Sequence, residues 1–105
     1  MITVVGKATS NEQASSFITD LKNRALITSG FIYHPHLYTD YENLVIKNYD
    51  DNVPNVNYTN KITNHWLEAN NYVVLLRLHP ECPDNYKIIE KLAKEIHGIN
   101  ELVKL

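Results

Sequence analysis

The histidines are the side chains in this sequence best suited to chemistry, because imidazole exchanges protons near neutral pH and binds metal ions. The chain has five histidines and one cysteine. His34 and His36 are two residues apart, so on a strand both would point to the same face. His79 and Cys82 form an H-x-x-C pair after a long apolar segment. Imidazoles from both pairs and the thiolate could in principle complete a tetrahedral zinc site.

Neither of these pairs has a second cysteine or histidine at a recognised zinc spacing. Pro80 and Pro83 flank the second pair and indicate an ordinary turn between a strand and a helix. In the sheet that we predict below, the two pairs would lie on strands at opposite edges. We therefore expect no metal site and no cofactor.

Cys82 is a second possible centre, as a nucleophile with His79 or His97 as its base. A catalytic cysteine needs a lowered pKa, which a helix N-terminus or a nearby cation can supply. Cys82 does precede a predicted helix. However, no family signature surrounds it, and free cysteines are more often inert packing residues. We assign no catalytic residue.

Aromatic residues are concentrated in one part of the chain. They are Phe31, Tyr33, Tyr38, Tyr41, Tyr49 and Tyr58. On a strand over residues 31–38, one face would carry Phe31 and Tyr33, and the other Ile32, His34, His36 and Tyr38. Only one face is expected to pack under helices, so the other presents aromatic rings or a His/Tyr surface.

Tyrosine and histidine suit recognition, because they combine apolar area with a polar tip. The alternative is a sheet face stabilised by cross-strand aromatic pairs. The candidate binding residues are Tyr33, His34, His36 and Tyr38.

The N-terminal half of the chain predicts a strand, a helix and a hairpin. Residues 2–8 are rich in β-branched residues and predict a strand. Ser10 and Gln13 have the spacing of a capping box and open a helix. Its apolar stripe is Ala14, Phe17, Ile18, Leu21 and Ala25. Gly30 should stop this helix, and residues 31–38 and 42–49 should form a β-hairpin.

The C-terminal half predicts a helix, a strand and a second helix. Residues 59–70 form a weak helical pattern, and residues 72–79 an almost continuously apolar strand that should be covered on both faces. A helix follows from Pro83, with a stripe of Ile89, Leu92, Ala93 and Ile96. Beyond Gly98 the helix either continues to the C-terminus or gives way to a short strand over residues 99–103. We favour the helix.

The resulting order is β-α-β-β-α-β-α in a single α+β domain over residues 1–105. Its first six elements have the order of a ferredoxin-like fold, a four-stranded antiparallel sheet with helices on one face. This analogy predicts little about function, because the fold hosts many unrelated activities.

Charge and hydropathy exclude some partners. Ten Lys and Arg oppose twelve Asp and Glu, and Glu90 interrupts the densest basic run, residues 87–94, which Glu95 follows. Nucleic acid is therefore not an expected partner. The longest apolar stretch, residues 72–76, is far below the roughly 20 residues of a membrane helix. The N-terminal residues do not resemble a secretory signal, so we expect a cytoplasmic protein.

Two functional hypotheses follow. The first is a small non-enzymatic binding protein that docks a protein partner, or sequesters a small ligand, through the aromatic and His-rich hairpin. Such a protein could form a homodimer through an exposed edge strand. Its bias towards residues with AT-rich codons fits an inhibitor encoded by a phage or another mobile element. The second is a small enzyme with a histidine acid/base, or a His/Cys metal site, in a pocket enclosed by a dimer.

Overall fold

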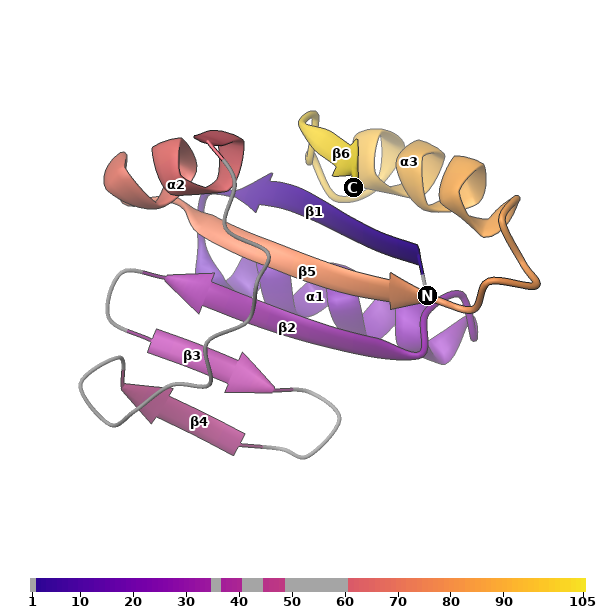
Figure 1. The fold of residues 1–105 in the computed structure, drawn as a ribbon, viewed down its shortest axis with the longest axis horizontal. Coiled ribbons are helices and arrows are strands. Elements are labelled where there is room, and N and C mark those ends of the chain that lie inside the picture. The colour runs from indigo at the N-terminus through magenta and orange to yellow at the C-terminus, as the bar shows by residue number, and fades with distance from the viewer. Residues whose placement is uncertain (1, 35–36, 41–44, 49–60) are drawn as a thin grey trace.

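The fold was analysed in a computed structural model, which describes residues 2–34, 37–40, 45–48 and 61–105. Side chains are described for residues 2–34 and 63–105. These residues form an α+β structure with one antiparallel sheet and three helices (Figure 1). Within these ranges, no helix has the length and apolar character needed to span a membrane.

The sheet is built around two central strands. β1 (Ile2–Ala8) and β5 (Tyr72–Leu78) pair antiparallel along their whole length. β2 (Ser29–His34) pairs with the other side of β5, and β6 (Leu102–Lys104) with the other side of β1.

Two further strands extend the sheet beyond β2. β3 (Leu37–Asp40) pairs with β2, and β4 (Val45–Asn48) pairs with β3. The strand order is therefore β4-β3-β2-β5-β1-β6 (Figure 1). The single strand predicted over residues 31–38 is wrong, because its described residues belong to two strands, the end of β2 and the start of β3. Its Pro35 lies outside the described residues, and the predicted returning strand corresponds to β4.

α1 (Asn11–Asn23) begins where the sequence predicted. The Ser10 hydroxyl accepts a hydrogen bond from the Gln13 amide at 3.1 Å. Gln13 in turn accepts from the amide of Thr9 at 2.8 Å, so it bonds one residue earlier than a standard capping box. The helix ends sooner than predicted, because Ala25 is exposed and has a φ of 58°.

Gly30 does not stop this helix but lies inside β2. A Cβ atom at this position would lie 2.6 Å from Cγ2 of Ile18 on α1. The glycine is needed because the strand and the helix approach so closely.

The helices cover both faces of the sheet. α1 and α3 (Asn85–Glu95) pack on one face, which we call the α1/α3 face. α2 (Lys61–Glu68) packs on the opposite face, the α2 face, through Trp66. The prediction of helices on one face is therefore wrong. β5 explains why, because Val74 and Leu76 belong to the first cluster and Val73 and Leu75 to the second. Its predicted burial on both faces is confirmed.

The C-terminal segment ends in a strand, so the favoured helical interpretation is wrong and the alternative is right. Gly98 has a φ of 66°, a backbone conformation that L side chains rarely adopt. The chain turns there, and the Ile99 amide donates to the Ala93 carbonyl at 2.9 Å. Ile99 is buried, and β6 follows along the edge of β1. The observed order is β-α-β-β-β-α-β-α-β instead of the predicted β-α-β-β-α-β-α.

Candidate functional site

Tyr33, the first candidate binding residue, is fully buried on the α2 face. It shares a cluster with Phe31 and Trp66. Ile32 is buried on the opposite face, in the cluster under α1 and α3. Both faces of β2 are therefore covered at these residues, whereas the sequence predicted one covered face. Tyr33 has no exposed surface with which to contact a partner.

His34, the second candidate, lies at the end of β2 and is half-buried. Its ring stacks on Tyr72 with centroids 4.2 Å apart and planes inclined by 22°. His36 lies outside the described residues. Tyr38 is in β3, where its backbone pairs with Tyr33. The described part of the candidate surface is thus one aromatic stack, between the last residue of β2 and the first residue of β5.

His79, the histidine of the pair with Cys82, lies far from His34. His34 follows Tyr33, which pairs with Val73 near the start of β5, whereas His79 follows the last residue of that strand. Seven strand residues separate these two ends by about 20 Å. His34 and His79 are therefore apart, but they lie near opposite ends of the central strand β5 and not at opposite sheet edges. Within the described ranges, no three His, Cys, Asp or Glu residues are grouped so that they could hold a metal ion.

Cys82 is exposed in the loop between β5 and α3. In this loop, Nδ1 of His79 accepts a hydrogen bond from the Glu81 amide at 3.2 Å. His97 lies beyond the other end of α3, whose 11 residues span roughly 16 Å. His97 therefore cannot serve as a base for Cys82 in this arrangement.

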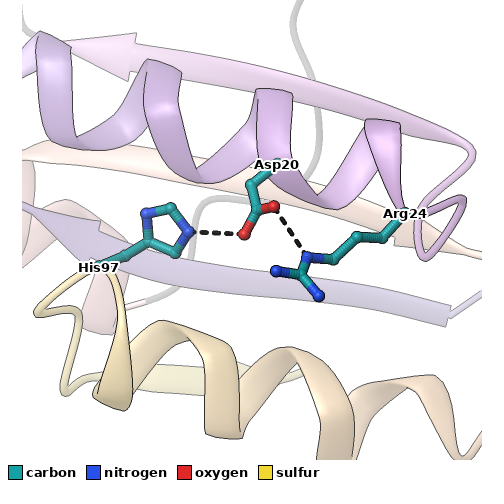
Figure 2. A network of polar contacts seen from close by, with 3 residues as sticks. All are labelled: Asp20, Arg24 and His97. Atoms are coloured by element: carbon teal, nitrogen blue, oxygen red, sulfur yellow. Dashed lines mark hydrogen bonds and ion pairs between the residues drawn. The ribbon is translucent and has the colours of Figure 1, made fainter.

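A polar cluster of His97, Asp20 and Arg24 lies between α1 and α3 (Figure 2). Nε2 of His97 lies 2.9 Å from Oδ2 of Asp20. The other carboxylate oxygen, Oδ1, accepts a hydrogen bond from Nε of Arg24 at 2.8 Å. An ionised carboxylate can only accept, so Nε2 of His97 carries the proton of the first bond. We call these three residues the seam cluster.

The seam cluster is more buried at the histidine than at the arginine. The side chains of His97, Asp20 and Arg24 are 10%, 25% and 49% exposed. Hydrogen bonds from His97 and then Arg24 lower the pKa of Asp20, and this effect outweighs the opposing effect of burial. Asp20 is therefore ionised at neutral pH and holds both partners by charge-assisted hydrogen bonds.

Further contacts fix His97 in place. Its ring packs against Phe17 with centroids 5.2 Å apart and an interplanar angle of 57°. Nε2 of Gln13 donates to the His97 carbonyl at 2.8 Å. A His–Asp pair can position an imidazole for proton transfer. Here the contacts join α1 to the turn between α3 and β6, which supports a structural role.

Sequence reasoning considered His97 only as a base for Cys82, and missed Asp20 and Arg24. Two signals were available. Asp20 and Arg24 are four residues apart on a predicted helix, the spacing of an ion pair. Asp20 also follows Gln13 by seven residues and Phe17 by three, which places it beside the buried stripe. Their partner His97, in the turn after α3, could not be found without the tertiary structure.

Comparison of the chain with known proteins found no relative. No family model matches the chain, and neither a curated protein nor a solved structure is similar to it. The contacts of the sheet and of the seam cluster are therefore the basis for any statement about function.

Proposed function

We propose that this is a non-catalytic binding protein that docks a protein partner through the β2–β3–β4 end of its sheet. The observation that carries the proposal is the extension of the sheet past its helical cover. Among the described residues, α1 packs mainly on β1, β2 and β5, and α2 on β1 and β5. β3 and β4 continue the sheet beyond these strands. A sheet end of this kind can pair with, or lie against, another chain.

The topology supports a division between a scaffold and an insertion. Strands β2-β5-β1-β6, with α1 and α3 on one face, are arranged as we would expect for a ferredoxin-like core. In this interpretation β3, β4 and α2 form an insertion between the second and third core strands. An element added to a common scaffold is a natural place for function, because the scaffold itself hosts many activities.

The seam cluster also favours binding over catalysis. Its carboxylate bonds to both neighbours, and its imidazole is packed against Phe17. The His97 side chain is also only 10% exposed, which leaves little of the imidazole open to a substrate. The candidate residues of the proposed surface are His34, His36 and Tyr38, and Tyr33 supports the strand from the interior.

The edge strand β4 gives the proposal a first partner to test, a second copy of the chain. Backbone groups at a free sheet edge can pair with the same edge of another molecule, which gives a symmetric dimer. The bias of the amino-acid composition towards residues with AT-rich codons is consistent with a phage-encoded inhibitor in the cytoplasm, and this origin is part of the same proposal.

Native mass spectrometry, followed by affinity capture, tests the proposal. We expect the wild type to form a homodimer or to capture a protein partner, and we expect the H36A/Y38A variant to lose this association. H79A, which changes a histidine at the far end of β5, is the matched control and should keep it. If H36A/Y38A binds as the wild type does, the site assignment is wrong. A substrate turned over by the wild type but not by H34A/H36A would support the enzymatic hypothesis instead.

A further inference from the structure

α3 presents large apolar side chains to solvent. The described part of the chain has three exposed large apolar side chains: Ile88 at 47%, Ile96 at 58% and Leu105 at 49%. Two of the three lie on α3 or at its C-terminal cap. Leu92, midway between them, is half-buried. The sheet therefore covers only part of the apolar surface that this helix presents.

Ile88, Leu92 and Ile96 form a continuous ridge along α3. Ile88, Leu92 and Ile96 are successive i, i+4, i+8 positions, the row that packs into grooves of another helix in the commonest type of helix pairing. The buried stripe beside this ridge consists of Ile89 and Ala93. Leu92 packs in part against the same core cluster as this stripe, so Ile88 and Ile96 are the ridge residues most open to a second helix.

The solvent side of α3 is basic, although the whole chain carries a net charge of −2. Lys87, Lys91 and Lys94 are all exposed. None of them lies within 4.0 Å of a carboxylate in the described ranges.

The two glutamates of α3 offset this charge only in part. Glu90 accepts a hydrogen bond from the Tyr86 hydroxyl at 3.3 Å, and Glu95 is exposed. Lys104 of β6 adds a fourth cation, 5.8 Å from the centroid of the Tyr86 ring. The surroundings of the ridge therefore present an excess of positive charge to a partner.

We propose that α3 docks an acidic amphipathic helix of another protein, whose apolar row packs on Ile88, Leu92 and Ile96. Its carboxylates pair with the three lysines. A second copy of this chain is a poorer occupant, because its lysines would face lysines across a symmetric contact. This surface is separate from the sheet end discussed above, so either proposal can fail without the other.

Two synthetic helical peptides test the inference. Both have the same leucine row, flanked by glutamates in one and by lysines in the other. Fluorescence anisotropy with the full chain at low ionic strength should show the glutamate peptide binding about tenfold more tightly, since each exposed ion pair contributes only a few-fold. Added salt should reduce this preference. K87E/K91E/K94E should reverse it, and I88S/I96S should weaken binding of both peptides.

L105S is the matched control, since it removes an exposed leucine outside α3, and it should bind as the wild type does. Circular dichroism of each variant separates lost binding from lost folding. Equal affinity for the two peptides, or unchanged binding by I88S/I96S, would overturn the proposal. Tighter binding to vesicles of anionic phospholipid than to the glutamate peptide would replace it with a membrane surface. A dimer that I88S/I96S dissolves would replace it with a second copy.

Discussion

The two faces of the sheet are covered in different ways. On the α1/α3 face, two helices bury a large cluster that draws residues from β1, β2 and β5 and includes Ile99. On the α2 face, one helix of eight residues covers a small cluster in which Trp66 is its buried anchor. Near the other end of this face, the Arg77 guanidinium lies 5.3 Å from the centroid of the Phe31 ring.

This contrast assigns different roles to the two faces. Hydrophobic stabilisation scales with the apolar area removed from water, so the α1/α3 face supplies most of the stability. The seam cluster adds a polar tie between the two helices of that face. Among the residues whose side chains are described, the α2 face has the smaller buried cluster, so we expect α2 to be the helix best able to open without global unfolding.

Phe17→Ala should give the largest loss. Phe17 is fully buried beneath α1 and also contacts the His97 ring. Removing such a side chain costs about 3–5 kcal/mol, because the cavity closes only in part. Urea denaturation measures the loss, and Ser16→Ala at the exposed neighbouring position should change stability by less than about 0.5 kcal/mol. A cost near that of the control would show that this face is not the main source of stability.

Trp66→Ala should cost less, about 2 kcal/mol, although tryptophan is larger. If α2 can detach locally, the free energy of that opening limits the loss. Urea denaturation followed by circular dichroism measures it, with His65→Ala on the exposed side of the same helix as the control. A loss as large as that of Phe17→Ala would mean that the two faces stabilise the fold equally.

Gly30→Ala should cost about 1–3 kcal/mol, because the new methyl group would overlap Ile18. Ile18→Ala creates space at this contact, so the double variant should be more stable than the sum of the two single losses predicts. A double-mutant cycle measures the difference. Strict additivity would contradict the close approach of α1 to β2.

Asp20→Asn should cost about 1 kcal/mol at neutral pH, since it weakens two charge-assisted hydrogen bonds at a partly exposed site. The pKa of Asp20 is lowered in the folded state, so its contribution is complete above its unfolded pKa of about 4. The contribution should decline as pH falls through the lowered folded pKa. Denaturation of the wild type and the variant across this range measures it, with the exposed Glu81→Gln as the control. A difference that is constant down to low pH would show that Asp20 does not hold the seam cluster by its charge.

Much of the local structure could be predicted from the sequence. The period of apolar residues predicted α1 and α3, and the unbroken apolar run predicted a strand buried on both faces. The topology was harder, because strand order depends on pairings between distant residues. The weak pattern over residues 59–70 gave no sign that Trp66 packs on the opposite face. Gly30 was predicted to end the helix, whereas the close approach of Ile18 explains why this position of β2 is a glycine.

The candidate site was less predictable than the fold. Spacing alone drew attention to His34, His36, His79 and Cys82, but spacing does not show which end of a strand a residue occupies. The seam cluster forms between Asp20 and His97, which are 77 residues apart. Only the antiparallel packing of α1 and α3 brings them together. Tyr33 was chosen for its type, whereas its burial depends on α2.

The most direct test of the contrast between the two faces is native-state hydrogen exchange on the wild-type protein. We predict that amides in the centres of α1 and β5 exchange only through global unfolding, with the free energy that urea denaturation gives. Amides of α2 should exchange through a local opening of lower free energy and weak dependence on denaturant. If α2 amides are as protected as those of α1, the two faces form one cooperative unit and the account is wrong.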